Sequence, residues 1–159
     1  MHLLLLIFIT FNSLNASSVK KSYLPIPRFV SIKSSEARLH VGPGMQYPTI
    51  FIYLKKNLPV KIIDEYDTWR KIRDSEGTEG WFHKSLLQGK RTVMVIDDEC
   101  LLYKKPDESS ETIAVIKNNI ICILKSYSED WAYIKINNMY GFVHRNKIYG
   151  ILKSEKNGK

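Results

Sequence analysis

Two histidines and two cysteines are the residues of this chain whose types could do chemistry. His83 and His144 stand at equivalent places in two similar stretches of sequence. A metal site or an acid–base pair needs partner residues at a suitable spacing, and neither histidine has a second histidine or a cysteine nearby in the chain. We therefore expect each histidine to pack or to form hydrogen bonds at the rim of a folded unit. We expect no metal, no cofactor and no catalytic residue.

Cys100 and Cys122 are not flanked by groups that would lower a thiol pKa, so the sequence does not favour a reactive thiolate. Both occupy core-facing positions of predicted strands. One interpretation is a pair of free, buried thiols. The other is a disulfide, which would close a loop of about 22 residues and stabilise the fold by about 3 kcal/mol. An oxidising compartment favours the disulfide, and the Cβ geometry that decides between the two is not visible in a sequence.

The chain begins with an apolar run over residues 3–11, followed by small and polar residues up to Ser18. The run is shorter than the ~20 residues that a helix needs to cross a bilayer. We interpret residues 1–17 as a secretory signal peptide, although the run is preceded by no Lys or Arg. A buried strand or a short helix is the alternative. The signal peptide predicts a periplasmic or secreted protein with no membrane span in the mature chain.

The rest of the chain repeats itself. Residues 28–89 align with residues 91–150 with only two one-residue gaps, and Lys90 alone separates them. Among the ordered matches, Trp69 meets Trp131 and His83 meets His144. So many matches in order predict two homologous modules. Before them, residues 18–27 are expected to form an extended lead-in, and after them residues 151–159 are expected to form a disordered basic tail.

Each module is predicted to be all-β. Its apolar runs are short, rich in Val, Ile, Tyr and Trp, and separated by turn residues, and no stretch shows sustained helical periodicity. The predicted strands are 29–33, 37–41, 49–54, 60–65, 69–73 and 79–82 in the first module, and 93–96, 100–104, 113–116, 120–126, 131–136 and 140–143 in the second. Short strands in about 60 residues bury one face best by closing into a small barrel.

Four segments of the first module resemble the bacterial SH3 (SH3b) domain family. They are Ala37–Gly44, Tyr47-Pro48, Trp69–Arg73 and Gly77–Trp81. The second module fits the family pattern more loosely. The resemblance implies two tandem SH3-like barrels behind a signal peptide, a protein of the Gram-negative periplasm, and a binding role without catalysis. His40 falls at a basic position of the family pattern and is expected to be exposed.

The tryptophans mark the predicted ligand site. Trp69 and Trp131 each lie three positions before the core isoleucine of their strand, so they point away from the core unless a bulge intervenes. Such a tryptophan either plugs the end of a barrel or lines a surface groove, and both interpretations stay open. If the tryptophans line grooves, the ligand would lie across Tyr47, Trp69 and His83, with Trp131 and His144 as a second site. The aromatic platform that polyproline ligands need is incomplete.

The charge of the chain favours an anionic partner. Lys and Arg number 24 against 16 Asp and Glu, which gives a net charge of +8. The basic residues are dispersed among acidic ones, which does not favour nucleic-acid binding. A cationic surface suits polyanionic envelope material such as peptidoglycan. We therefore expect a non-catalytic protein that binds peptidoglycan or another envelope component. The alternative is a protein–protein adaptor that docks through exposed strand edges.

Overall fold

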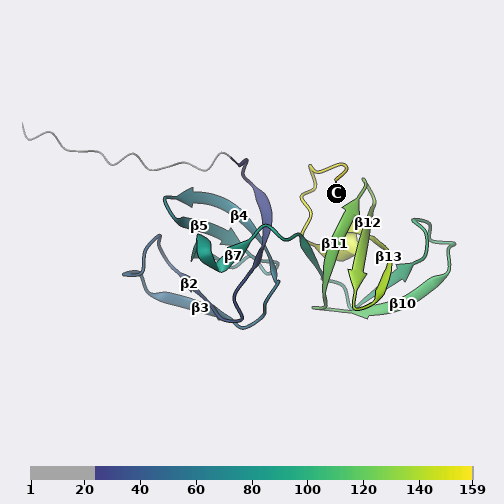
Figure 1. Cartoon of the computed structure of the whole chain (residues 1–159), viewed down its shortest axis with the longest axis horizontal. Coiled ribbons are helices and arrows are strands. Elements are labelled where there is room, and N and C mark those ends of the chain that lie inside the picture. Colours follow the sequence, from purple (N-terminus) through teal and green to yellow (C-terminus); the bar gives the residue numbers. More distant parts are fainter. Residues whose placement is uncertain (1–23, 159) are drawn as a thin grey trace, which may run out of the picture.

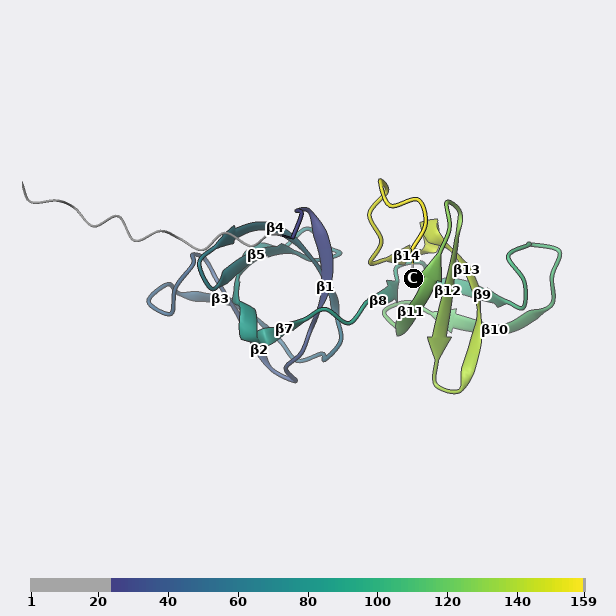
Figure 2. The same cartoon turned by 45° about the horizontal axis from the view of Figure 1, so that its top comes forward.

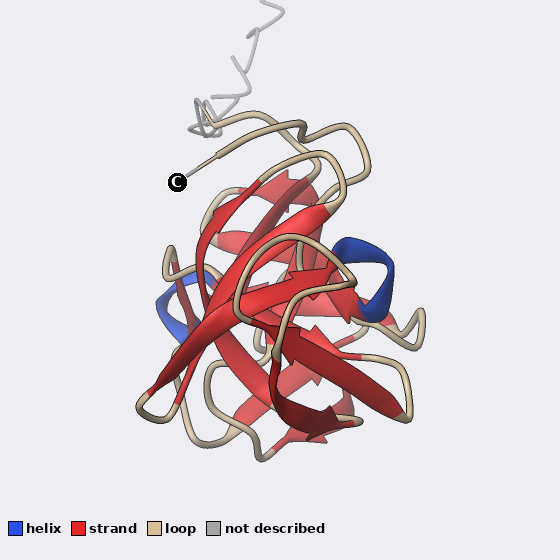
Figure 3. Ribbon diagram, turned by 90° about the vertical axis from the view of Figure 1, so that its right-hand side faces the viewer, coloured by secondary structure: helices blue, strands red, loops and turns tan. Residues whose placement is uncertain are grey.

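The computed structural model describes residues 24–158. They form fourteen β-strands and two 3₁₀ helices, and no α-helix occurs in this part of the chain. Figure 3 shows this dominance of strands over helix. The all-β class predicted from the sequence is confirmed. The signal peptide predicted at residues 1–17 and the first part of the lead-in lie outside the described residues.

The strands fall into two sets of seven. The first set is β1 (Arg28–Ile32), β2 (Ala37–His40), β3 (Thr49–Tyr53), β4 (Pro59–Tyr66), β5 (Trp69–Arg73), β6 (Glu79–His83) and β7 (Leu87–Gln88), with the 3₁₀ helix η1 (Lys84–Leu86) before β7. The second set is β8 (Thr92–Val95), β9 (Glu99–Tyr103), β10 (Thr112–Lys117), β11 (Ile121–Tyr127), β12 (Trp131–Ile136), β13 (Met139–His144) and β14 (Ile148–Tyr149), with η2 (Arg145–Lys147) before β14.

Each set forms one antiparallel sheet, and the two sheets have the same strand order. The orders are β3-β2-β6-β5-β4-β1-β7 and β10-β9-β13-β12-β11-β8-β14. The equivalence of the two halves that the repeat predicted therefore extends to their topology. Figure 1 shows the two modules side by side, joined by the short segment between β7 and β8.

Closure of each sheet into a barrel, which the sequence predicted, is not found. Among the described residues no pairing joins the edge strands β3 and β7, or β10 and β14. The sheets are instead strongly coiled, and in Figure 2 strands β1 to β5 curve around the centre of the first module. The edge strand β7 has two residues and already pairs with β1, so it offers few groups for a further ladder.

Alternation along the strands builds one apolar core in each module. The first core includes Ile32, Leu39, Ile72 and Phe82, all with essentially no exposed surface. The second core has equivalent members, which include Val95, Leu102, Ile134 and Val143. Because strand residues two positions apart share a face, the repeated sequence pattern places the same positions inside each sheet.

Cys100 and Cys122 are members of the second core, and both are free thiols in the structure. The disulfide interpretation is therefore not the arrangement found. Burial raises the pKa of Cys100 to about 11 and that of Cys122 to about 12. The buried environment keeps both thiols protonated at neutral pH.

These pKa values predict inert thiols and a loss of stability in alkali. At pH 8 the thiolate fraction of Cys100 is on the order of 10⁻³, so a disulfide reagent should label the folded chain at least about 100-fold more slowly than the unfolded chain. Because both pKa values are raised on folding, their stabilising contribution is complete below the unfolded pKa near 9 and falls as pH rises toward 11 and 12. Fast labelling of the folded chain at pH 8 would contradict the burial of these thiols.

Several direct contacts connect the two modules. The rings of Phe29 and Tyr149 meet edge to face with centroids 4.9 Å apart. The Tyr149 hydroxyl donates a hydrogen bond to the Arg73 carbonyl at 2.8 Å, and burial raises the pKa of this phenol above its usual value. The Thr92 hydroxyl donates to the Asn57 carbonyl at 2.8 Å. The modules are thus held by specific contacts as well as by the chain between them.

The C-terminal residues differ from the disordered basic tail predicted for 151–159. Residues 151–158 pack along the second module. The Arg91 guanidinium donates to both carboxylate oxygens of Glu155, at 3.2 and 3.1 Å, and Tyr127 forms a β-bridge with Gly158. Bidentate pairs of this kind fix geometry as well as charge. Composition alone predicted a solvated tail because its partners lie far back in the chain, Arg91 64 positions before Glu155 and Tyr127 31 positions before Gly158.

Candidate functional site

An aromatic cluster lies at one end of the first sheet. Trp69 and His83 are direct cross-strand partners on β5 and β6, and their rings meet edge to face with centroids 5.6 Å apart. His40, at the end of β2, meets the other side of the Trp69 ring at 5.5 Å. Trp69 is 7% exposed, so most of its surface is covered by these neighbours. The tryptophan is both a packing residue and one wall of the site.

Local backbone features place these three side chains. Asp67, with a φ of 48°, turns the chain between β4 and β5, so that Trp69 begins β5. His83 ends β6 and caps η1, where its Nδ1 lies 2.8 Å from the Ser85 hydroxyl. His40 Nδ1 lies 2.8 Å from the Tyr47 carbonyl, which can only accept, so Nδ1 carries the proton.

His40 is buried at 6% exposure, and the prediction that it is exposed is wrong. A basic position on an edge-near strand is usually solvated, but here the ring covers Trp69 and binds the backbone of the β2–β3 loop. The sequence carried a signal for this role. His40 and its repeat equivalent Tyr103 each follow a fully buried core leucine, and both are ring-bearing residues.

A cavity of about 310 Å³ opens over this cluster. Its lining residues are Glu36, Arg38, His40, Met45, Trp69, His83, Ser85 and Leu86. Tyr47 does not line the cavity, and its ring packs over Gly42, where an added Cβ would lie 2.6 Å from a ring carbon. Of the predicted first site, the structure brings Trp69 and His83 together and leaves Tyr47 outside.

The second module repeats the cluster with closer stacking. Trp131 and His144 are cross-strand partners on β12 and β13, and their ring centroids lie 3.9 Å apart at an interplanar angle of 32°. Tyr103 meets Trp131 edge to face at 5.6 Å. The structure thus brings together both residues predicted for the second site and adds Tyr103, which sequence reasoning missed.

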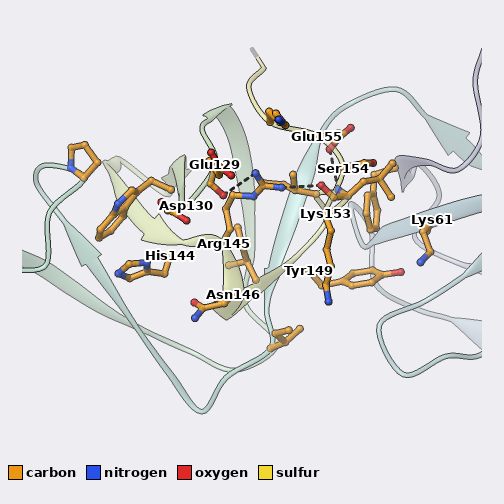
Figure 4. Close-up of a pocket in the computed structure, with 18 of the residues that line it drawn as sticks. Lys61, Glu129, Asp130, His144, Arg145, Asn146, Tyr149, Lys153, Ser154 and Glu155 are labelled. Atoms are coloured by element: carbon orange, nitrogen blue, oxygen red, sulfur yellow. Dashed lines mark hydrogen bonds between the residues drawn. The ribbon is translucent and has the colours of Figure 1, made fainter.

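A larger groove, with a volume of about 1390 Å³, runs from this second cluster toward the first module. Trp131, His144 and the β9–β10 loop line one end, and Phe29 and Lys61 of the first module line the other. Figure 4 shows His144 and Lys61 at opposite ends of the view, with Arg145 crossing between them. The C-terminal segment, residues 151–156, forms a wall of the groove.

Arg145 connects two walls of this groove by hydrogen bonds. Its guanidinium donates to the carbonyls of Ser128 and Glu129, at 2.7 and 3.0 Å, and to that of Leu152 at 2.8 Å. It also lies 5.7 Å from the centre of the Tyr127 ring, near the same distance as Arg91 at 5.8 Å. These contacts hold the C-terminal segment beside the loop that precedes Trp131.

Replacement of Glu155 by glutamine tests the anchoring of the C-terminal segment. Glu155 accepts from Arg91 and from the Leu152 backbone N–H at 3.0 Å, so removing its charge weakens three hydrogen bonds. We expect amide exchange of residues 150–158 to accelerate at least about tenfold, a change of ~1.4 kcal/mol in local stability. The exposed Glu111→Gln substitution is the control. Equal exchange in both variants would contradict the anchoring.

Both pockets are lined by aromatic, apolar and polar side chains that can contact a ligand. Within residues 24–158 there is no group of three or more His, Cys, Asp or Glu side chains arranged to hold a metal ion. The first pocket offers ring edges, a hydroxyl and the Glu36–Arg38 ion pair, whose nearest atoms are 3.1 Å apart. Concave, ring-lined pockets with few polar groups are typical of sites for small ligands or polymer segments.

Two coiled antiparallel sheets of one topology, each with a ring cluster at the same end, define a tandem all-β protein built from two similar modules. Residues 33–89 match the family model described as bacterial SH3 domain. Most of the first module is therefore similar in sequence to bacterial SH3 domains. No curated protein sequence matches the chain.

Solved structures with some likeness to the chain include three NlpC-type proteins. NlpC2 from Trichomonas vaginalis is 13% identical over 85% of this chain and 52% of its own, with a TM-score of 0.38. An NlpC/P60 family protein from Bacillus cereus is 16% identical over 76% and 55%, with a TM-score of 0.35. NlpC1 from Trichomonas vaginalis is 11% identical over 80% and 47%, with a TM-score of 0.36. The chain spans about half the length of these proteins.

None of the helices in residues 24–158 has the length and apolar character needed to span a bilayer.

Proposed function

We propose that this protein is a non-catalytic binding protein of the bacterial cell envelope that recognises peptidoglycan through the ring clusters of its two modules. One observation carries the proposal. The same cross-strand pair of tryptophan and histidine occurs at the same place in both modules, Trp69 with His83 and Trp131 with His144. Each pair opens onto a cavity rather than lying sealed in a core.

The physical properties of the two sites suit a polymer of sugars and short peptides. Aromatic edges and faces contact the apolar faces of sugar rings, and nearby polar groups can orient a peptide. The net charge of +8 favours association with a polyanion. Two sites on one chain also raise the avidity for a repeating ligand, because the second binding event becomes intramolecular.

The proposal requires the protein to leave the cytoplasm, because peptidoglycan lies outside the inner membrane. The bacterial SH3 match and the signal peptide predicted at residues 1–17 both support a periplasmic or secreted location. Mass spectrometry of the protein from an envelope fraction would measure the mature N-terminus. A chain that retains residues 1–17 in the cytoplasmic fraction would defeat this part of the proposal.

Co-sedimentation with purified peptidoglycan tests the binding function. We expect the protein to be enriched in the pellet, and we expect a variant with both His83→Ala and His144→Ala to lose most of that enrichment. The exposed Asn118→Ala substitution is the matched control and should bind like the parent chain. No enrichment of the parent protein in the pellet would sink the proposal.

A second candidate function, a protein–protein adaptor, is favoured by the edge strand β3. Within residues 24–158 this strand pairs only with β2, and it exposes Ile50, Phe51 and Ile52 by 49%, 48% and 45%. An apolar edge strand without charged residues offers a template for strand addition by another protein. A pull-down from envelope extract separates the candidates, because a stoichiometric protein partner without affinity for peptidoglycan would favour the adaptor.

A further inference from the structure

The hairpin formed by β2 and β3 carries many exposed apolar side chains. Within residues 24–158, β3 is an edge strand that pairs only with β2. The exposed apolar residues of the hairpin, which we call the hairpin patch, are Val41, Met45, Tyr47, Ile50, Phe51, Ile52 and Leu54. Each of them is at least 40% exposed. Apolar side chains grouped in this way on a folded protein mark a contact surface.

A β-bulge explains why successive residues of β3 are exposed. The register of β2 with β3 shifts at Ile50, which is an extra residue of β3 that faces no residue of β2. Such an insertion interrupts the alternation of the two faces, and β3 is exposed from Thr49 to Ile52. Between two edges of this kind, the bulge favours packing of side chains over a regular strand ladder.

The repeat gives an internal comparison for this surface. Residues 41–54 contain no charged residue, although 25% of the residues in the chain are charged. The equivalent residues 104–117 of the second module contain six, which are Lys104, Lys105, Asp107, Glu108, Glu111 and Lys117. Two of these lysines are ion-paired with glutamates of the same hairpin. Charged side chains protect an exposed edge against association, and the first module lacks this protection.

Hydrogen bonds and ring contacts hold the hairpin in one conformation. The Val41 N–H donates to the Pro48 carbonyl at 3.1 Å. The Phe51 ring lies against that of Tyr53, with centroids 4.8 Å apart. Tyr53 is buried, and its hydroxyl donates to Asp74 Oδ2 at 2.7 Å. A surface that is already ordered loses little conformational entropy when it binds.

A second copy of this chain matches the hairpin patch. β3 contains the symmetric sequence Ile50-Phe51-Ile52. A two-fold axis at Phe51 would place this ring beside the partner's Phe51, and Ile50 beside the partner's Ile52. Because residues 41–54 are uncharged, no like charges of these segments meet across the axis. Salt screens charges more than ~8 Å apart at physiological ionic strength, so the net charge of +8 opposes the contact only weakly.

A lipid bilayer matches the same surface less well. The edge of β3 presents backbone N–H and C=O groups that no other strand of residues 24–158 pairs. Such groups have a large free-energy cost in hydrocarbon, where no water can bind them. A second copy can cover the apolar side chains while these backbone groups keep their contact with water.

We propose that this protein forms a two-fold symmetric dimer in which the hairpin patches of two copies pack on one another. The dimer goes beyond the proposed binding function, which concerns the ring clusters of a single chain. It would bring four ring clusters into one assembly, and a repeating ligand would then be held with higher avidity.

Sedimentation equilibrium of the purified protein, without peptidoglycan, tests the dimer. We expect a monomer–dimer equilibrium over protein concentrations of about 1 to 200 μM. Ile52→Glu should raise the dissociation constant at least about tenfold, because it places an unpaired carboxylate in the apolar contact.

Val115→Glu is the matched control, because Val115 is the equivalent residue of β10. Its exposure of 49% is close to the 45% of Ile52. This variant should dimerise like the parent chain, and circular dichroism should show that both glutamate variants are folded. A protein that stays monomeric up to about 200 μM would overturn the proposal. A dimer that both variants weaken equally would overturn it as well.

The other occupants of the patch give different results. Monomeric protein that co-sediments with phosphatidylglycerol vesicles, and no longer does so as Ile52→Glu, would assign the patch to lipid and overturn the dimer. Monomeric protein that retains a stoichiometric envelope protein, again lost in Ile52→Glu, would assign it to a different protein and overturn the dimer too. Because peptidoglycan is absent from the equilibrium measurement, its result is independent of the co-sedimentation test of the binding function.

Discussion

Alanine in place of Trp69 should lower the free energy of unfolding of the first module by about 3–5 kcal/mol. The indole is 7% exposed and sits between the rings of His40 and His83, so its removal leaves a large void that these neighbours cannot fill. Urea denaturation followed by circular dichroism measures the effect. The expected loss is large because the side chain combines apolar burial with two edge-to-face contacts.

The equivalent substitution in the second module is the natural comparison. Trp131 is more exposed than Trp69. His144 stacks on the Trp131 ring, whereas His83 meets the Trp69 ring edge to face. Trp131→Ala should therefore cost less, about 1–3 kcal/mol, and act more on ligand binding. If Trp69→Ala cost less than Trp131→Ala, the interpretation of Trp69 as a packing residue would be wrong.

Alanine at Gly80 is the second substitution with a large expected effect, a loss of about 3 kcal/mol or more in the first module. A Cβ at this position would lie 2.5 Å from Leu39 Cγ and 2.9 Å from the His40 carbonyl oxygen. Leu39 has no exposed surface, and the carbonyl is backbone, so neither neighbour can move away easily. The strain would fall on the strand pair that carries His40 and His83.

Gly89→Ala is the matched control for this substitution. Nothing lies within 4 Å of a Cβ built at Gly89. The φ of Gly89 is not positive, in contrast to that of Gly77, which is 90°. Stability should change by less than about 0.5 kcal/mol. Thermal denaturation of the two variants side by side gives the comparison, and a neutral Gly80→Ala would show that β2 and β6 are farther apart than the structure places them.

The sequence predicted the positions of most strands correctly because the signals for strands and turns are local. Short apolar runs separated by Gly, Pro and Asp turns determine strand positions within a residue or two, and the predicted strand at 69–73 coincides with β5. The repeat also predicted that Trp69 with His83, and Trp131 with His144, form corresponding pairs. In the structure, the antiparallel register of β5 with β6 and of β12 with β13 makes the two residues of each pair direct cross-strand neighbours.

The errors share one physical cause, which is partnership between residues distant in sequence. His40 has the composition of an exposed position, but a tryptophan 29 residues later covers it. The C-terminal segment has the composition of a solvated tail, but Arg91 and Arg145 bind it. Tyr47 has the sequence neighbourhood of a groove residue, yet its ring turns toward Gly42.

The amino-acid sequence by itself determined that this protein is all-β, duplicated, and equipped with a tryptophan and a histidine at matching places in each half. These features depend on residue type and periodicity, which act within a few positions of the chain. Only the tertiary structure decided that the sheets coil without closing, that the modules touch through Phe29 and Tyr149, and that the second ring cluster opens into a groove walled by the C-terminal segment. Those outcomes depend on which distant surfaces meet, and a linear pattern of apolar and polar residues does not specify that choice.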